Sequence, residues 1–188
     1  MMARQAAILC GGLGSRLGDL TRRTPKPLLT VDGRPFLDVI IEFVARQGVR
    51  RILLLAAFEH DQMKDYAARA ASRLELDIEV EVAIEPGRAG TGGALWHARD
   101  QLDDLFFLLN GDSFFDLPLA RLAEALQHRS EALGALALRE VDAAGRYGVV
   151  ETSGQTITRF LESAPDPSAP ATINAGIYLL RKPLILEA

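Results

Sequence analysis

The chain has 188 residues, a formal net charge of −4, and 48% hydrophobic and 24% charged residues, a composition typical of a soluble globular domain. One cysteine excludes an internal disulfide, and no apolar run approaches the roughly 20 residues of a membrane helix. We therefore expect a single cytoplasmic domain over residues 1–188 and no membrane span, and the acidic balance argues against a nucleic-acid surface.

Apolar strands alternate with amphipathic helices along most of the chain. A helix begins after Pro35 and ends at Gly48, residue types that favour a first helical turn and a helix end. In chain order, the patterns predict strands at 6–9, 51–58, 77–84, 105–109 and 133–139, helices at 61–73, 91–99 and 119–129, short strands at 147–151 and 156–160, and a last strand at 174–180.

This alternation predicts an α/β fold with a doubly wound, mainly parallel, Rossmann-like sheet, helices on both faces, and a small β lid in the last third. Binding sites in such folds lie at the carboxyl ends of the strands. Residues 1–34 carry six lysine and arginine residues against two aspartates, although the chain as a whole is acidic. Because a small anion responds to the local field, this basic segment is a candidate anion site.

A glycine-rich segment follows directly after the first predicted strand. Its sequence is Gly-Gly-Leu-Gly-Ser-Arg-Leu over residues 11–17, and Pro-Lys-Pro follows at 25–27. Glycines allow a sharp turn and leave backbone N–H groups uncovered, so that an anion can approach closely. Together with Arg16 and Lys26, the glycines at 11, 12 and 14 predict a cradle for a polyphosphate.

Two common phosphate-binding motifs do not fit this segment. A dinucleotide fingerprint that starts at Gly12 requires a glycine where the chain has Leu17, and Asp32 comes before the next strand has begun. A Walker A loop requires Gly-Lys-Ser/Thr in register, and Lys26 lies too far along the chain. The glycine count therefore disfavours an NAD-dependent oxidoreductase.

Asp112 directly follows the predicted strand at 105–109, within the sequence Asn-Gly-Asp-Ser. A carboxylate in this position suits Mg²⁺, which takes one or two carboxylates together with substrate phosphates. The same residues are also typical of an ordinary turn. The polyphosphate loop at the end of a different strand favours the metal site over the turn.

A second glycine-rich loop spans residues 85–94 and leads into a predicted helix. Its backbone amides and helix N-terminus suit a phosphate or a base edge, although a flexible connector is an equal alternative. Near the later strands, Tyr147, Gly148 and Glu162 place an aromatic ring, a bare backbone and a carboxylate in one region, where the carboxylate suits vicinal sugar hydroxyls. Glu162 could also be an ordinary solvated side chain.

Taken in order, these motifs resemble the sugar-1-phosphate nucleotidyltransferases over nearly the whole chain. The resemblance also includes Arg-Tyr-Gly at 146–148 and Asn-Ala-Gly-Ile-Tyr at 174–178. The spacing from Arg16 to Lys26 and the segments 33–37 and 110–115 are most similar to the D-glycero-D-manno-heptose 1-phosphate guanylyltransferase branch. The mannose-1-phosphate guanylyltransferases come next.

The resemblance implies transfer of a nucleotidyl group from a nucleoside triphosphate to a sugar 1-phosphate, with Mg²⁺ as cofactor. The triphosphate would be held by Gly11, Gly12, Gly14 and Arg16. The reacting phosphates would be contacted by Lys26, and the metal would be held by Asp112. Base and ribose would lie near Thr91, Gly92 and Gly93. The sugar would be lined by Tyr147, Gly148, Glu162 and Asn174.

The chain departs from the family pattern in three places. Ser163 stands where the family usually has lysine, and the loop that begins at Glu85 is two residues longer than usual before Gly90. Members also continue beyond the equivalent of residue 188 and supply a second metal-binding aspartate there, for which this sequence offers no candidate. We therefore expect a domain without the usual C-terminal end.

These departures leave alternatives open. A nucleotide-binding or regulatory homologue that no longer turns over is one alternative. Transfer from dTTP or UTP to glucose 1-phosphate is another, because guanine is implied only by the branch resemblance. The oligomeric state, a homo-oligomer included, is not determined by the sequence.

Overall fold

The computed structural model describes residues 3–12, 15–21, 24–57, 60–87, 90–145 and 147–186, without the side chains of residues 15–17 and 60. Its main strands are β1 (Gln5–Leu9), β4 (Arg51–Ala56), β5 (Glu79–Ile84), β6 (Leu105–Asn110), β7 (Gly134–Val141), β8 (Val149–Ser153), β9 (Thr156–Leu161) and β10 (Ala171–Arg181). The helices are α1 (Phe36–Arg46), α2 (His60–Leu74), α3 (Gly90–Ala98), α4 (Ala120–Gln127) and α5 (Pro183–Leu186). Short elements are the 3-10 helices η1 (Ser15–Thr21), η2 (Lys26–Leu28) and η3 (Arg99–Gln101) and the strands β2 (Thr30–Val31) and β3 (Arg34–Pro35).

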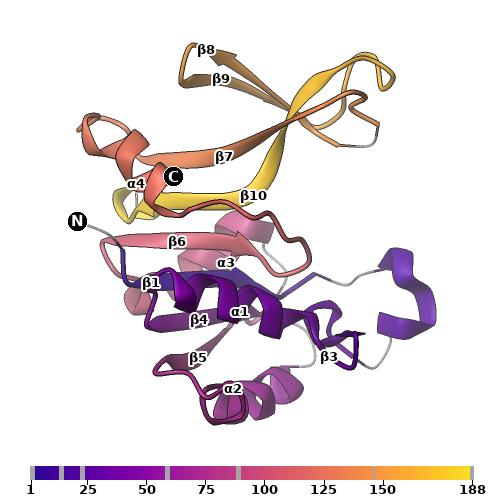
Figure 1. Ribbon diagram of the computed structural model, residues 1–188, viewed down its shortest axis with the longest axis vertical. Coiled ribbons are helices and arrows are strands. Elements are labelled where there is room, and N and C mark those ends of the chain that lie inside the picture. Colours follow the sequence, from indigo (N-terminus) through magenta and orange to yellow (C-terminus); the bar gives the residue numbers. More distant parts are fainter. Residues whose placement is uncertain are drawn as a thin grey trace.

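The described main strands form one mixed sheet in the order β5-β4-β1-β6-β10-β8-β9, and β7 pairs with β10 (Figure 1). The first four strands of this order are mutually parallel. Leu9, the last residue of β1, pairs with Leu55 of β4 and Asn110 of β6. The segments that follow β1, β4 and β6 therefore leave the sheet side by side at one edge, as the parallel core predicts.

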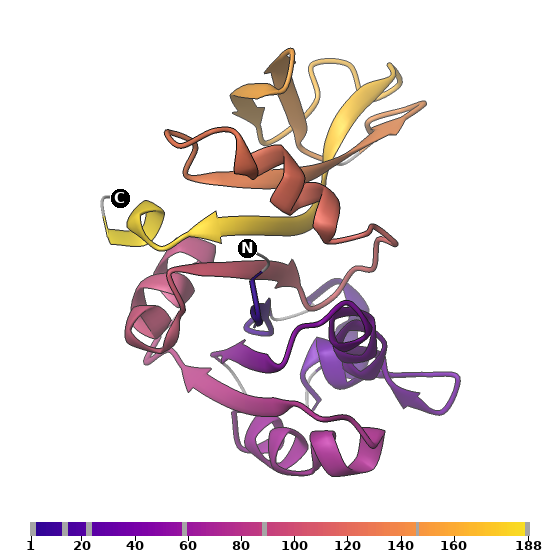
Figure 2. The same ribbon diagram turned by 60° about the vertical axis from the view of Figure 1, so that its left-hand side comes forward.

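Helices cover both faces of the parallel core, as the sequence patterns predict (Figure 2). On one face, α1, α2 and α4 pack against alternate strand residues such as Ile8, Leu54 and Phe107. On the other face, α3 and α5 cover the intervening residues, among them Leu53 and Phe106. Both faces of each central strand are therefore buried, which explains the continuous apolar runs. No helix in the described ranges is long and apolar enough to cross a bilayer.

The last third of the chain adds antiparallel strands to the same sheet. β10 pairs antiparallel with β7 on one side and, at successive positions on its other side, with β8 and β6, and β8 pairs antiparallel with β9. Figure 1 shows the β8–β9 hairpin at the end of the sheet remote from β5. The predicted β lid is thus an extension of the sheet. Its strands β8, β9 and β10 follow β7 without an intervening helix, which suits antiparallel pairing.

Candidate functional site

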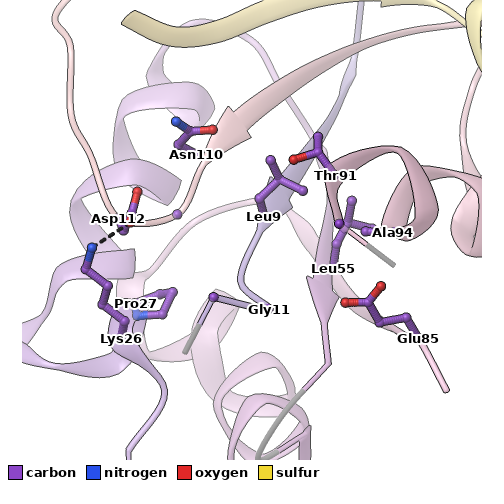
Figure 3. Close-up of a pocket in the computed structure, with 13 residues that line it drawn as sticks. Leu9, Gly11, Lys26, Pro27, Leu55, Glu85, Thr91, Ala94, Asn110 and Asp112 are labelled. Atoms are coloured by element: carbon purple, nitrogen blue, oxygen red, sulfur yellow. Dashed lines mark hydrogen bonds and ion pairs between the residues drawn. The ribbon is translucent and has the colours of Figure 1, made fainter. Parts of the chain in front are cut away.

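A cleft of about 430 Å³ opens at the carboxyl edge of the parallel strands (Figure 3). Segments from six parts of the chain meet there: the end of β1 with its turn, η2, the end of β4, the residue after β5, the start of α3, and the end of β6 with its turn. The lining residues are Leu9, Gly11, Gly12, Lys26, Pro27, Leu55, Glu85, Gly90, Thr91, Ala94, Asn110, Gly111 and Asp112. The cleft therefore combines an apolar floor with charged and backbone polar groups at its rim.

Lys26 and Asp112 contact each other directly across this cleft. The Nζ of Lys26 donates to Oδ2 of Asp112 at 2.6 Å (Figure 3). A tight backbone turn holds Lys26, because the N–H of Leu28 donates to Pro25 and the N–H of Leu29 donates back to Lys26. The buried Pro27 anchors the turn, so that only the lysine side chain remains free to rotate.

Gly111 places Asp112 opposite Lys26. Its N–H donates to the carbonyl of Leu9 at 3.0 Å, which ties the turn after β6 to the end of β1. A Cβ on Gly111 would lie 2.4 Å from the Leu9 oxygen and 3.3 Å from Cγ of Pro27. The absence of a side chain therefore allows the turn after β1, the η2 turn and the turn after β6 to meet at one point.

Gly11 and Gly12 have different surroundings. A Cβ on Gly11 would lie 3.1 Å from Oε1 of Glu85 and 3.2 Å from Cβ of Ala57, so a side chain here would need these neighbours to shift by a few tenths of an ångström. A Cβ on Gly12 would meet none of the described residues within 4 Å, and this residue is exposed. Gly12 therefore leaves open space beside a bare backbone, which is the geometry that a bound anion needs.

Glu85 is a polar residue of the cleft that the sequence analysis did not assign as a site residue. Its Oε2 atom is buried and has no hydrogen-bond partner within the described residues. A buried carboxylate oxygen without a donor is unfavourable, which suggests that a ligand supplies one. Its position directly after β5, at the carboxyl edge of the parallel strands, was the signal in the sequence.

The start of α3 separates the cleft from a second, more apolar groove of about 640 Å³. Gly90 begins the helix with a positive φ of 71°. Thr91 lines both hollows, whereas Gly92 and Gly93 line the groove. Of the three residues expected near base and ribose, only Thr91 belongs to the lining residues of the cleft given above.

The residues expected at the sugar lie together at a junction of three strands, apart from the lining of the cleft. Val149 of β8 pairs with Leu161 of β9 and with Ile173 of β10. The expected sugar residues are the chain neighbours of these three: Gly148 precedes Val149, Glu162 follows Leu161, and Asn174 follows Ile173. We call this the strand junction. A Cβ on Gly148 would lie 2.7 Å from the carbonyl oxygen of Leu161.

The other expected residues are only partly described. Tyr147 precedes the strand junction and is 51% exposed. Gly14 lies outside the described residues. Arg16 lies in η1, but its side chain is not described. The expectation that Arg16 contacts a triphosphate therefore stays a prediction.

Cys10 lies beside the cleft but is not suited to be a nucleophile. Burial raises the pKa of its thiol far above the ordinary value, and the negative charge of Asp112 raises it further. A thiol that stays protonated is a poor nucleophile. Cys10 is therefore a small buried residue of the core.

The donor set fits a magnesium ion that arrives with phosphates. The described residues contain no group of three or more histidine, cysteine, aspartate or glutamate side chains that could hold a metal by themselves. Asp112 instead offers one carboxylate at the open edge of the cleft, and its contact with an ammonium group shows that it accepts a cation here. Mg²⁺ commonly uses one or two carboxylates and completes its shell with phosphate oxygens and water.

Comparison with known proteins agrees with this geometry. A model of the nucleotidyl transferase family matches residues 5–188. The D-glycero-alpha-D-manno-heptose 1-phosphate guanylyltransferase of Campylobacter jejuni is 34% identical over 178 residues, which cover 95% of this chain and 76% of that protein. Mannose-1-phosphate guanylyltransferase 1 of Arabidopsis thaliana is 35% identical over 190 residues, which cover 97% of this chain and 51% of that protein.

Among solved structures, HddC from Yersinia pseudotuberculosis complexed with GMP-PN superposes with a TM-score of 0.83. The two sequences are 28% identical, and the match covers 99% of this chain and 80% of that one. The match over nearly the whole length includes the parallel core and the antiparallel strands. The chain therefore belongs to the nucleotidyl transferase family.

Proposed function

We propose that this chain transfers a guanylyl group from GTP to a heptose- or mannose-type sugar 1-phosphate, with release of pyrophosphate. The observation that carries the proposal is the pairing of Lys26 with Asp112 at 2.6 Å, beside the bare backbone of Gly12 in one cleft. The family match and the names of the heptose and mannose relatives support the reaction class.

In this reaction, an oxygen of the sugar phosphate attacks the α-phosphorus of GTP in line. A new phosphorus–oxygen bond forms, and the bond to the β-phosphate oxygen breaks, so that pyrophosphate leaves. A phosphate monoester is already mostly a dianion at neutral pH, because its second pKa is about 6, and no general base is needed. Catalysis then consists of positioning and of neutralising charge.

The residues of the cleft supply both functions. Gly11 and Gly12 present backbone N–H groups toward the phosphates, and Lys26 and Arg16 donate to the oxygens that gain charge. Asp112 holds the metal, and the prolines on both sides of Lys26 limit the freedom lost when its side chain binds. Bound Mg²⁺ would neutralise phosphate charge as a Lewis acid.

Glu85 supports guanine as the preferred base. The N1–H and the N2 amino group of guanine are adjacent donors, and they match the two oxygens of a carboxylate. Uracil and thymine offer one N–H between two carbonyl oxygens, which a carboxylate repels. We propose that a Glu85 oxygen that lacks a partner among the described residues accepts from guanine when GTP occupies the cleft.

The proposed sugar site includes Tyr147, Gly148, Glu162 and Asn174. Three of these residues adjoin the strand junction, and Glu162 is exposed, so that its carboxylate is available for sugar hydroxyls. Ser163, next to Glu162, carries no positive charge. The phosphate of the sugar would therefore be bound by the cations of the N-terminal segment.

A pyrophosphate-release assay tests this function. GTP, ATP, CTP, UTP and dTTP are each combined with heptose, mannose and glucose 1-phosphates in the presence of Mg²⁺. We expect release with GTP and a heptose or mannose 1-phosphate. Binding of GTP without release in any combination would favour the non-catalytic alternative, and release only with UTP or dTTP would contradict the base assignment.

The Glu85→Gln variant sharpens the test of the base. An amide offers one donor and one acceptor, which match the carbonyl and N–H of uracil but cannot accept from both N1–H and the N2 amino group of guanine. We expect kcat/KM for GTP to fall by about 10- to 100-fold, the range for one charge-assisted hydrogen bond, while the value for UTP rises or stays constant. An equal loss for both nucleotides would indicate a structural role instead.

A further inference from the structure

The proposed function assigns Lys26 and Asp112 to different ligands, although in the structure they bind each other. Lys26 is assigned to phosphate oxygens and Asp112 to the metal, yet Nζ of Lys26 lies 2.6 Å from Oδ2 of Asp112. A magnesium–oxygen bond is shorter still, about 2.0–2.1 Å, so a metal on this carboxylate would lie close to the ammonium group. Two cations beside one carboxylate repel each other, so that the bound lysine weakens the binding of a metal there.

We propose that Lys26 is a displaceable stand-in for the metal, so that its ammonium group weakens metal binding until a triphosphate draws the lysine away. This inference rests on the proposed function, because it takes Asp112 as the metal ligand. Nucleotide and divalent cation then bind with positive cooperativity, since each removes an obstacle to the other. The lysine thus couples metal entry to nucleotide entry.

The exposure of the pair supports an exchange of partners over a permanent bridge. The side chains of Lys26 and Asp112 are 31% and 45% exposed, and partly solvated ion pairs of this kind are weak. A lysine side chain reaches a new partner by rotation about its own bonds while its backbone stays in place.

The cleft does not depend on this ion pair for its shape. The bond from the N–H of Gly111 to Leu9 and the buried Pro27 hold the two turns independently of the lysine charge. Removal of that charge should therefore leave the turns in position. The exchange can accordingly be tested by substitution without loss of the fold.

The test is a titration of the nucleotide-free protein with Mn²⁺, followed by electron paramagnetic resonance of the free ion. Lys26→Met removes the charge and keeps the length of the side chain. We expect it to bind Mn²⁺ about tenfold more tightly than the unaltered protein, a coupling of ordinary size. Lys26→Arg keeps a cation beside Asp112 and should not show this gain.

Lys64→Met is the matched charge control, because Lys64 lies on α2 in an exposed pair with Asp61 at 3.9 Å, away from the cleft lining. It removes one positive charge and should leave Mn²⁺ affinity unchanged. A similar gain in Lys64→Met would show a general charge effect and overturn the inference. Circular dichroism of each variant verifies that it is folded.

The double variant Lys26→Met/Asp112→Asn separates this inference from the proposed function. If Lys26→Met binds Mn²⁺ no more tightly than the unaltered protein, the stand-in role is wrong, and the pyrophosphate-release assay still decides the function. If the double variant keeps the gain, the metal does not bind at Asp112, which overturns both the inference and the proposed metal site. Loss of the gain in the double variant supports both.

Discussion

The cleft and the strand junction use polar residues in opposite ways. In the cleft, Glu85 keeps a buried oxygen unpaired among the described residues, and Asp112 contacts the partly exposed Lys26. At the strand junction, Asn174 is engaged twice: its Nδ2 donates to the hydroxyl of Tyr178, and its Oδ1 accepts from the N–H of Gly176. The cleft therefore has capacity to bind a ligand, whereas Asn174 already serves the fold.

The difference follows from how the two regions are built. Parallel strands deliver the ends of distant segments to one edge, where their side chains need not pair with the sheet. The strand junction is antiparallel and irregular, because the register of β10 against β7 shifts between Asn174 and Tyr178. The side chain of Asn174 satisfies a backbone group where the ladder is interrupted. The predictions below test this contrast.

The largest expected effect belongs to Lys26→Ala in the cleft. Loss of this donor should lower turnover by about 10²-fold or more, the scale for one preorganised donor to a charged transition state. The pyrophosphate-release assay measures the effect, and Lys64→Ala is the control. Near-normal turnover of Lys26→Ala would remove the cleft from the proposed mechanism.

The next effect is that of Gly111→Ala, which tests whether the turns of the cleft depend on close packing. The new Cβ would lie 2.4 Å from the carbonyl oxygen of Leu9 and would force the two turns apart. We expect the free energy of unfolding to fall by about 1–3 kcal/mol, as for other overpacked sites, and turnover to fall with it.

Gly87→Ala is the control for Gly111→Ala, because its new Cβ would have no neighbour within 4 Å in the part of the chain that the structure describes. Urea denaturation of both variants gives the comparison. Equal stability of the two variants would show that the turns adjust freely and that Gly111 does not position Asp112.

A loss of stability of similar size is expected at the strand junction for Asn174→Ala. It removes two hydrogen bonds and should lower the free energy of unfolding by about 1–3 kcal/mol, roughly twice the loss for Tyr178→Phe, which removes one. The pair also sharpens the sugar assignment. If Asn174 binds the sugar, the KM for sugar 1-phosphate should rise in the Asn174→Ala variant and not in the Tyr178→Phe variant. Equal KM values in the two variants would restrict Asn174 to a structural role.

The smallest effect concerns the buried Asp38, which lies away from both regions. Burial raises the pKa of its carboxyl, but hydrogen bonds from Arg73 and Tyr66 outweigh this and hold the pKa below its ordinary value. The ionised carboxyl therefore contributes its full stabilisation above about pH 4, the pKa of an aspartate in the unfolded chain. This stabilisation is lost as the pH falls through the lower pKa of Asp38 in the folded protein.

Tyr66→Phe removes one of these donors, which lies 2.6 Å from Oδ1 of Asp38. We expect a loss of about 1 kcal/mol at pH 7, and an acid-induced loss of stability that begins at higher pH than in the unaltered protein. Urea denaturation between pH 7 and pH 3 measures both. Identical pH profiles would show that the tyrosine does not influence the titration of Asp38.

Much of the fold could be predicted, because its signals are local. The spacing of apolar residues after Pro35 indicates α1, and the apolar run at 105–109 indicates β6, which extends to Asn110. The strand predicted at 174–180 begins earlier, at Ala171, because pairing with β7 recruits residues of weak strand pattern. The small β2–β3 hairpin was not predicted, since two-residue strands leave no periodic pattern.

The sequence by itself determined the residue types of the candidate site, because glycine turns, a proline-flanked lysine and an acidic strand end are properties of short segments. Only the tertiary structure decided that Lys26 binds Asp112, that Gly111 must lack a side chain, and that a Glu85 oxygen is buried without a partner among the described residues. Each of these depends on contacts between segments far apart in the chain. Such contacts are set by the order and register of strands, which no local pattern encodes.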